Sequence, residues 1–335
     1  MKTKLYLAVI AIIILLYIVF QIDKETKSQT ATIGSVKKVT FAASKTFSPA
    51  PIWIAKDLGF FKQAGIDAEV INYSSGKTTT EAMLKDEVDI SASAEFLAVK
   101  KYSKNKELRI LSTSAFVHQI KLLTLNASKI SKISDLKGKR IGVRIGTNGE
   151  FFLSRLLTLN NLQNNDISWI NISPQDKADA MAEGTVDGVI TWPPFVQHIQ
   201  ERLADKISVF DGQPGQDYYY VLLTKNSWYE NNKDTAVRVM QALKMTEEWI
   251  FQEPEKSTQY FAKKFELEPD KVSEVLKRYR FSISLPQTLI TAMEAETRWL
   301  QKEKQAQDKQ AVNYLDMILF EPLLKVSPAD VTIVH

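Results

Sequence analysis

Short runs of serine, threonine, asparagine and glycine are the residues of this 335-residue chain best suited to hold a small polar molecule. Each run stands where a strand-like segment gives way to a helix-like one, and small residues there let backbone N–H groups approach a ligand. Phe47 and Trp192 would add apolar walls. The candidate ligand-binding residues are Phe47, Ser48, Ser74, Gly76, Thr78, Ser93, Ala94, Glu95, Thr147, Asn148, Gly149, Trp192, Asp217 and Tyr218.

The same residues also have a purely structural interpretation. Serine, threonine, asparagine and glycine before a helix are common N-caps, and acidic residues such as Glu95 and Glu150 suit the first turn of a helix. Asp217 suits a turn before a strand. Side chains of the Tyr218–Tyr220 run alternate between the two faces of a strand, so at most two of these tyrosines can face a ligand. From the sequence alone, both interpretations stay open.

The charge of the ligand follows from two opposing features. Helix N-termini near Thr78 and Gly149 favour an anion, because free amides and the positive end of the helix dipole stabilise negative charge. Glu95, Glu150 and Asp217 would repel a simple anion and favour an amine. A taurine-like zwitterion or an amino-substituted heterocycle satisfies both features, so we expect such a ligand in preference to nitrate.

Composition argues against several other functions. The net charge is +4 with mixed signs and no basic block, so nucleic-acid binding is not expected. The chain has no cysteine and only three histidines, His118, His198 and His335, which are far apart. No Ser-His-Asp set, phosphate-binding glycine loop or carboxylate pair stands out. We therefore expect no catalytic residues, no metal and no cofactor.

Two series of alternating strands and helices follow one another after residue 38. Strands are expected at residues 39–43, 67–73, 89–92, 108–114, 120–125, 139–143, 167–172, 188–192, 207–210 and 218–224. Helices are expected at residues 52–64, 78–85, 95–103, 149–160, 174–183 and 194–203, and after residue 224 only helices are expected, at 235–251, 254–265, 269–279 and 286–304. Such alternation predicts an α/β fold in which each of two lobes is a doubly wound mixed sheet.

The expected lobes divide the chain discontinuously. Lobe 1 takes residues 38–117 plus 218–335, including the C-terminal helices, and lobe 2 takes residues 118–217. The strand at 218–224 is expected to return the chain to the first sheet. Two crossovers, near Ser114–Gln119 and Gln216–Tyr218, would then act as a hinge.

The first 25 residues have a different character from the rest. Lys2 and Lys4 precede an apolar run, Leu5–Phe20, which is typical of an export signal. No clear cleavage site follows, so we expect an uncleaved membrane anchor in preference to a cleaved signal. Residues 26–37 are expected to form a flexible linker, and the rest of the chain is expected outside the cytoplasmic membrane, in the periplasm or its equivalent.

Two segments resemble a known family. The segments Pro51–Phe61 with Gly65–Asp67, and Asp135–Val143, resemble the first helix and the start of lobe 2 in the nitrate/sulfonate/taurine (NitT/TauT-like) solute-binding proteins. Val88–Ile90 and Val186–Gly188 resemble paired strand entries of that family. The resemblance covers residues 38–225 and extends more loosely to 305. It implies a two-lobed periplasmic-binding-protein type II fold, with C-terminal helices.

The resemblance also implies a function. The chain would be a monomeric substrate-binding protein that closes on a small polar organic solute and delivers it to an ABC permease and ATPase. A membrane-tethered sensor is one alternative. A pyrimidine-synthesis enzyme of the same fold is another, although the enzymes of that type use a cysteine-rich motif that this chain lacks.

Overall fold

A computed structural model of the chain describes residues 36–303 and 312–334. The chain divides into two units, Met1–Lys37 and Lys38–His335, and the sheets and helices below belong to the second. The expected anchor Leu5–Phe20 and nearly all of the linker lie outside the described residues. Within the described residues, no helix combines the length and the apolar character that crossing a membrane requires.

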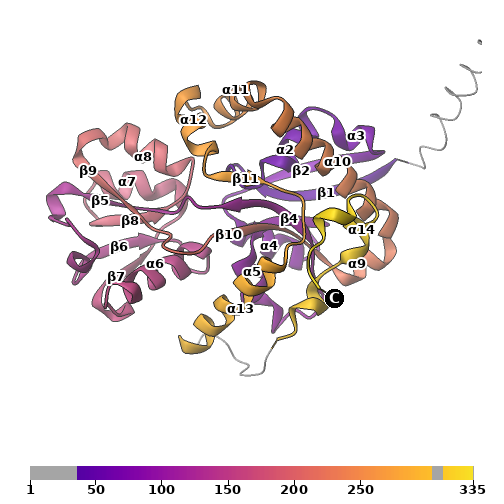
Figure 1. Cartoon of the computed structure of the whole chain (residues 1–335). Helices are drawn as coiled ribbons and strands as arrows, with labels where there is room; N and C mark the ends of the chain where they lie inside the picture. Colours follow the sequence, from indigo (N-terminus) through magenta and orange to yellow (C-terminus); the bar gives the residue numbers. More distant parts are fainter. Residues whose placement is uncertain (1–35, 304–311, 335) are drawn as a thin grey trace, which may run out of the picture. The chain divides into compact units, whose positions relative to one another are not determined.

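Lobe 1 is built on a six-stranded mixed sheet with the order β11-β4-β10-β3-β1-β2 (Figure 1). Strand β1 runs parallel to β3, whereas β10 runs antiparallel to both β3 and β4. Strand β10 therefore returns the chain to the first sheet, as the sequence predicts. The strands are β1 (Lys37–Ser44), β2 (Ile66–Tyr73), β3 (Ile90–Ala94), β4 (Leu108–Val117), β10 (Tyr218–Lys225) and β11 (Tyr279–Phe281).

Lobe 2 is built on a five-stranded mixed sheet with the order β7-β6-β8-β5-β9. Strand β6 is parallel to β7 and β8, and β5 is antiparallel to β8 and β9. The strands are β5 (Lys121–Leu125), β6 (Arg140–Val143), β7 (Ser168–Asn171), β8 (Gly188–Thr191) and β9 (Ile207–Asp211). Two mixed α/β sheets confirm the predicted fold class.

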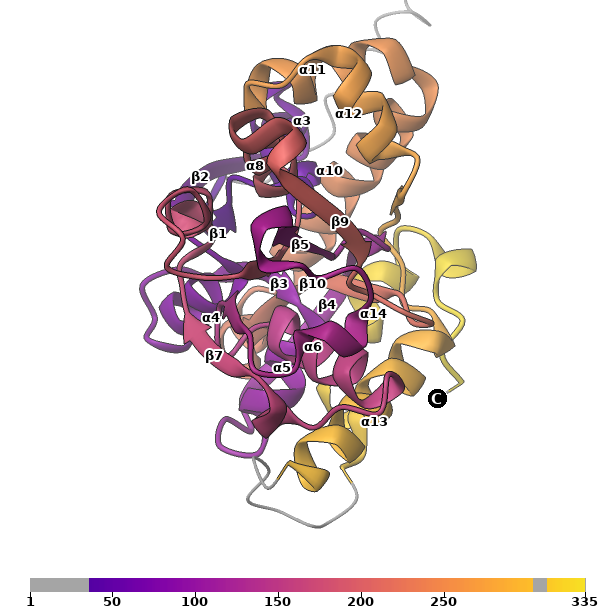
Figure 2. The same cartoon turned by 90° about the vertical axis from the view of Figure 1, so that its left-hand side faces the viewer.

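Helices cover both sheets (Figures 1 and 2). In lobe 1 they are α2 (Ala50–Asp57), α3 (Phe60–Gln63), α4 (Gly76–Leu84), α5 (Glu95–Tyr102), α9 (Asn226–Asn231), α10 (Lys233–Gln252), α11 (Pro254–Phe265), α12 (Pro269–Leu276), α13 (Gln287–Lys302) and α14 (Phe320–Leu324). In lobe 2 they are α6 (Asn148–Leu159), α7 (Lys177–Ala182) and α8 (Phe195–Leu203). Single 3₁₀ turns connect several of these elements, including the turn Pro174–Asp176 that leads into α7.

Two details differ from the sequence-based expectation. The helix expected at 52–64 is two helices, because Gly59 adopts a left-handed conformation with φ of 79° and ends the first of them. The segment after 224 is not purely helical, because Tyr279–Phe281 forms β11 against the end of β4. This short edge strand follows α12, whose last residue is Leu276 and not Tyr279.

The C-terminal tail packs on lobe 1. Ile318 forms a parallel bridge with Ile110 of β4, and Val331 forms another with Leu285. Helix α14 packs against α10 and against β4. The tail is therefore part of the lobe 1 core, and Met317 and Leu323 are fully buried in it.

Candidate functional site

A small cavity lies where the two sheets face each other. Its lining comes from the carboxyl ends of β1, β3 and β8, from the first turns of α4, α5 and α6, and from the start of β10. Its free volume is about 20 Å³, which is enough for about one water molecule. The lining residues are Thr46, Ser48, Gly76, Lys77, Ala94, Leu97, Thr147, Asn148, Trp192, Tyr218 and Tyr220.

Buried hydroxyl groups form one wall of the cavity. Ser48 Oγ lies 3.3 Å from Tyr218 Oη and 3.3 Å from Tyr279 Oη. Ser44 Oγ lies 3.3 Å from Tyr220 Oη. Burial raises the pKa of Tyr218 well above its usual value and raises that of Tyr220 to about 12. Both phenols therefore stay neutral at physiological pH and can donate a hydrogen bond to a ligand.

The first turn of α4 presents backbone to the cavity. Ser75 is the N-cap, and the Thr78 hydroxyl accepts a hydrogen bond from the Ser75 backbone N–H at 3.1 Å. Ser74 Oγ lies 3.3 Å from the same hydroxyl and is exposed. Ser74 and Thr78, two of the predicted ligand residues, thus shape the helix start and do not line the cavity. The N–H groups of Gly76 and Lys77 have no partner within the helix and remain for a ligand.

Position 76 requires glycine, because the start of α4 packs too closely against its neighbours to leave room for a side chain. A Cβ atom at position 76 would lie 3.0 Å from Ser93 Cβ and 3.3 Å from Tyr220 Oη. Ser93 is fully buried, and its hydroxyl donates to the carbonyl oxygen of Ala94 at 3.3 Å. Ser93 therefore supports Gly76 from behind, while Ala94 reaches the cavity itself.

The first turn of α6 faces α4 from the other lobe. Thr147 is its N-cap, and the Thr147 hydroxyl donates to the carbonyl oxygen of Arg144 at 2.7 Å. Glu150 does not point into the cavity. Its Oε2 accepts a hydrogen bond from Gly146 N at 2.8 Å and forms an ion pair with Lys100 at 3.2 Å. The negative charge of Glu150 is thus compensated, and the amide ends of α4 and α6 dominate the polarity of the site.

Trp192 supplies an apolar wall. It follows β8 directly and lies over Gly149. A Cβ atom added at position 149 would lie 3.5 Å from the indole ring. Lys177 lies beneath the ring, with Nζ 5.1 Å from the ring centroid. The Lys177 ammonium donates a hydrogen bond of 2.6 Å to the carbonyl oxygen of Ile190 in β8.

Two other predicted ligand residues lie outside the cavity. Phe47 is fully buried and stacks on Phe261 and Phe265, with ring centroids 5.1 and 4.4 Å away. Asp217 is exposed at the lobe crossover and lies 3.0 Å from His118 Nδ1. Neither side chain is among the cavity-lining residues.

Glu95 is buried under the cavity beside a second carboxyl group. Glu95 starts α5 and Glu296 lies in α13, and both side chains are fully buried. The backbone N–H groups of Tyr219 in β10 and of Glu95 and Phe96 at the start of α5 oppose the effect of burial, but neither carboxyl oxygen of Glu95 has a hydrogen-bond partner of normal geometry. Burial raises the pKa of Glu95 to about 8 and raises that of Glu296 well above its usual value. Both groups therefore hold protons at neutral pH and offer no negative charge to a ligand.

Four lining residues are absent from the predicted set: Thr46, Lys77, Leu97 and Tyr220. Thr46 and Lys77 belong to loops that the sequence singles out. Tyr220 could have been inferred from strand alternation, since it shares a face with Tyr218. Leu97 has no distinguishing signal, because an apolar residue one turn into a helix is ordinary core.

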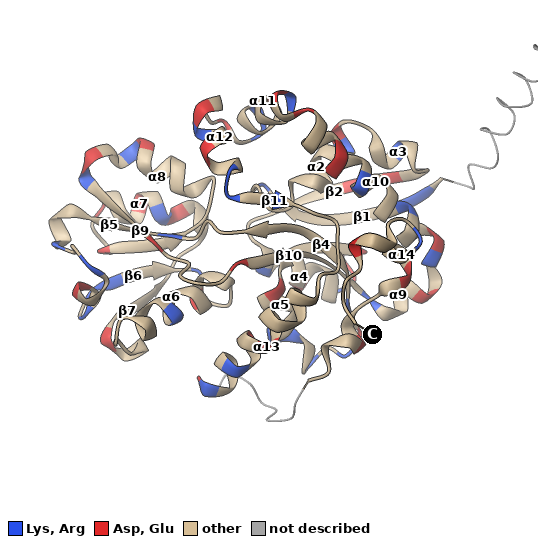
Figure 3. Cartoon of the chain, viewed as in Figure 1, with Lys and Arg blue, Asp and Glu red and all other residues tan. Residues whose placement is uncertain are grey.

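Positive charge near the cavity is not neutralised by carboxylates. Lys77 Nζ donates to the carbonyl oxygen of Ile145 at 3.4 Å. Within residues 36–303 and 312–334, neither Lys77 nor Arg144 forms an ion pair. Figure 3 shows that most charged residues lie on helices and loops away from the sheets. The cavity lining itself contains one cation, Lys77, and no carboxylate.

The two crossovers between lobes are joined by a buried glutamine. Gln213 Oε1 accepts hydrogen bonds from the backbone N–H groups of Gln119 at 2.8 Å and Ile120 at 3.1 Å. Gln213 Nε2 donates to the carbonyl oxygens of Val117 at 2.6 Å and Gln216 at 3.0 Å. One side chain thus ties the segment after β4 to the segment before β10.

Contacts on both sides of the cavity hold the lobes together. Lys271 of α12 forms an ion pair with Glu201 of α8 at 2.7 Å. Trp299 of α13 donates a hydrogen bond of 2.9 Å to Ser154 of α6. Figure 2 shows α8 close to α11 and α12. The structure is therefore a closed arrangement of the two lobes around the cavity.

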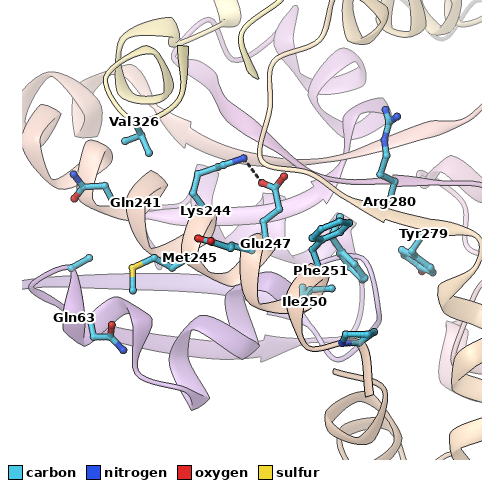
Figure 4. A pocket seen from close by; sticks show the side chains of 14 residues that line it. Gln63, Gln241, Lys244, Met245, Glu247, Ile250, Phe251, Tyr279, Arg280 and Val326 are labelled. Carbon is cyan, nitrogen blue, oxygen red and sulfur yellow. Dashed lines mark hydrogen bonds and ion pairs between the residues drawn. The ribbon is translucent and has the colours of Figure 1, made fainter. Parts of the chain in front are cut away.

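A larger hollow of about 1080 Å³ lies elsewhere on lobe 1, along α10 and β11 (Figure 4). Met245, Ile250 and Phe281 line it, and two of its charged residues, Lys244 and Glu247, are paired with each other. Lys244 contacts Glu247 at 2.7 Å, as Figure 4 shows, and also forms an ion pair with the tail. This hollow is open to solvent, and no residue of α4 or α6 lines it. It is therefore a less suitable site for a small solute than the cavity between the sheets.

Curated proteins with similar sequences include binding proteins and an enzyme. A Brucella abortus protein named as a binding protein is 21% identical over 213 residues, which cover 63% of this chain and 66%, just under two thirds, of that protein. YtlA of Bacillus subtilis, also classed as a binding protein by its name, is 22% identical over 93% of this chain and 95% of its own length. The 4-amino-5-hydroxymethyl-2-methylpyrimidine phosphate synthase of Schizosaccharomyces pombe is 25% identical over 55% of this chain and 52% of that enzyme.

A solved structure shares the fold over most of both chains. The alkanesulfonate-binding protein SsuA of Xanthomonas axonopodis pv. citri, bound to MOPS, superposes with a TM-score of 0.73 at 18% identity. The match covers 85% of this chain and 99% of that protein. A family model described as NMT1/THI5 like matches residues 46–257, which is more than half of the chain. The chain therefore belongs to the NMT1/THI5-like family of periplasmic-binding-protein folds.

Proposed function

We propose that the chain is the extracytoplasmic substrate-binding component of an ABC importer and that it binds a small organic anion of the sulfonate class. One observation carries this proposal. The cavity between the lobes is lined by neutral hydroxyls, two helix N-termini, one lysine and a tryptophan, and by no carboxylate. Such a set supplies hydrogen-bond donors and positive potential without any group that would repel an anion.

The donors suit a tetrahedral anionic head group. The amide ends of α4 and α6 approach the cavity from opposite lobes, and Lys77 adds a full positive charge. Neutral Tyr218 and Tyr220 can donate to further oxygens. The expected preference for an aminated ligand loses its basis, since Glu150 is ion-paired and Asp217 lies outside the cavity. Taurine stays in the proposal for its sulfonate group.

The apolar part of the lining suits a short carbon chain. Trp192 covers one side, and Ala94 and Leu97 contribute small apolar surfaces from β3 and α5. A purely inorganic anion would leave these surfaces unused. The MOPS bound to the fold relative SsuA is itself a sulfonate, which supports this choice of class.

The cavity favours binding over catalysis. Its lining holds no histidine, aspartate or glutamate that could serve as a general base, and the chain has no cysteine. One relative is a pyrimidine phosphate synthase, so an enzymatic role is the alternative to exclude. Purified protein that forms 4-amino-5-hydroxymethyl-2-methylpyrimidine phosphate would support that alternative.

Ligand entry needs the lobes to separate. A free volume of about 20 Å³ is far below the few hundred Å³ of a typical ligand pocket. We propose residues 38–117 plus 218–335 and residues 118–217 as the two moving bodies, with the Gln213 crossovers as the hinge. An ABC permease and ATPase would receive the ligand, and the N-terminal apolar segment would hold the protein at the membrane.

Isothermal calorimetry tests the proposal. We expect ethanesulfonate and taurine to bind more tightly than nitrate or an aminopyrimidine. Lys77→Met should weaken ethanesulfonate binding by roughly tenfold or more, because a hydrogen bond to a charged group contributes about 1.5–3 kcal/mol. Lys85→Met is the matched control, since Lys85 is exposed at the other end of α4.

Two results would contradict the proposal. Tighter binding of the aminopyrimidine than of either sulfonate would favour the heterocycle class. Equal ethanesulfonate affinity in the Lys77 and Lys85 variants would show that the anion does not bind at the start of α4.

A further inference from the structure

Lys177 is a buried lysine behind the wall of the cavity, and the hydrogen bonds around the cavity described above give no reason for its burial. It begins α7 in lobe 2, and its side chain is fully buried. Within the described part of the chain, its one hydrogen bond is the 2.6 Å bond that it donates to the Ile190 carbonyl oxygen. An ammonium group can donate three hydrogen bonds, so this environment only partly replaces the water that Lys177 loses on folding.

No counter-charge accompanies Lys177 among the residues that the structure describes. On its own element, Asp179 is exposed and paired with Arg202 of α8, and Asp176 is exposed in the turn before α7. In α8, Glu201 forms an ion pair with Lys271 of α12, and His198 contacts the carbonyl oxygen of Phe265. Strand β8 carries no charged residue. The charge that acts on Lys177 most directly is Arg144, which is also positive.

Lys177 is nevertheless directly coupled to the candidate site. Its Nζ atom lies 5.1 Å from the centroid of the Trp192 ring, which lines the cavity. An anion in the cavity with its carbon chain against Trp192 would lie on the other side of the ring from the ammonium group, so its negative charge would attract Lys177 across the cavity wall. In a buried, low-dielectric environment this interaction is much stronger than in water.

We propose that Lys177 is a specificity-determining residue for ligand charge, and that it takes up a proton when an anion binds over Trp192. This inference rests on the proposed function, since it requires an anionic ligand in the cavity. Lys177 does not touch the ligand in this arrangement. It acts through Trp192 and through the electrostatic potential that it and Arg144 create behind the cavity wall.

Burial and charge explain the proton uptake. Desolvation, together with the charge of Arg144, lowers the pKa of Lys177 to about 7. At pH 8 the side chain is then mostly neutral without a ligand. An opposite charge nearby raises the pKa of a lysine, by about one unit or more at short range, so binding should draw roughly half a proton or more from solution at pH 8. At pH 6 Lys177 is already protonated and the uptake should be small.

Calorimetry of ethanesulfonate binding at pH 8, in two buffers with different ionisation enthalpies, measures this proton. Ethanesulfonate has no titrating group in this range, so any proton taken up binds to the protein. We expect proton uptake in the parent protein and clearly less in Lys177→Met, where Glu95 with its pKa of about 8 is the titratable group that remains near the cavity. We also expect at least tenfold weaker binding in Lys177→Met at pH 6. Lys206→Met is the control, since it removes an exposed lysine of the same lobe and should change neither quantity. Melting curves check that each variant is folded.

The outcomes separate this inference from the proposed function. If ethanesulfonate binds and both proteins take up the same number of protons, the role of Lys177 is contradicted and the proposed function stands. If ethanesulfonate does not bind but acetate, nitrate or sulfate binds with proton uptake that Lys177→Met clearly reduces, the sulfonate class is wrong and the role of Lys177 stands. If none of these anions binds to the folded protein, both are contradicted.

Discussion

Protonated carboxyl groups under the candidate site are the most unusual feature at the scale of single residues. Glu95 and Glu296 are buried together, and their carboxyl oxygens have no hydrogen-bond partner among the residues that the structure describes. Burial keeps both in the neutral form at physiological pH. As neutral acids they do not oppose an anion in the cavity above them. The same two groups should, however, make the stability of the protein depend on pH.

The sign of this dependence follows from the raised pKa values. An unfolded glutamate loses its proton near pH 4.3, whereas folded Glu95 holds its proton up to about pH 8. The folded state therefore binds more protons in this window, and the free energy of unfolding falls as pH rises through it, by at most about 1.4 kcal/mol per pH unit for each proton. Below the window this stabilisation is fully present.

We predict that Glu296→Gln reduces the fall in unfolding free energy between pH 5 and pH 8. Glutamine has nearly the same size as glutamate and does not titrate. The variant therefore loses the contribution of Glu296 to the pH dependence of the unfolding free energy. Urea unfolding at several pH values measures the slope. Glu294→Gln, an exposed position in the same helix, should keep the slope of the parent protein, and equal slopes in both variants would contradict the prediction.

At the scale of elements, the segments that connect the lobes depend on one glutamine. Gln213 bonds to the backbone of both crossovers at four atoms. We predict that Gln213→Ala lowers the unfolding free energy by about 1–3 kcal/mol or more, because buried backbone groups lose their partners. Chemical denaturation provides the measurement. Gln200→Ala, at an exposed position of α8, should change the stability little, and a loss of the same size there would contradict this role for Gln213.

The elements themselves are largely predictable from the sequence, and the reasons are local. Strands such as β1 and β10 contain apolar runs, and α11 and α12 begin with proline where a missing N–H is harmless. The break at Gly59 and strand β11 were not predictable in this way. Gly59 looks like an ordinary residue in a helical pattern, and β11 exists only because the edge of β4 is available to it.

Side-chain directions were harder to predict than elements. Ser48, Thr147 and Trp192 stand at strand ends and do line the cavity, as their positions suggested. Phe47 occupies an equivalent position, yet it turns into a cluster with Phe261 and Phe265, which come from a helix more than 200 residues later. Asp217 likewise turns to His118. Such choices depend on partners that are distant in the sequence, so no local pattern could reveal them.

At the scale of the whole molecule, the part of the chain from Lys38 onward is a pair of sheets closed around a cavity too small for an organic solute. Ion pairs and ring contacts from α12 and α13 to lobe 2 stabilise this arrangement. The proposed function then requires an exchange between open and closed forms, for which we propose the two crossovers as the hinge. Several of the ion pairs that join the lobes, such as that between Lys271 and Glu201, are partly exposed, and such pairs contribute little to stability.

A crystal structure of the protein grown with ethanesulfonate tests the central claim most directly. The predicted result is a sulfonate group between the first turns of α4 and α6, within hydrogen-bond distance of the Lys77 side chain or backbone, with the ethyl group against Trp192. Ethanesulfonate bound only in the hollow beside α10, or an empty cavity between the lobes at saturating ligand, would contradict it.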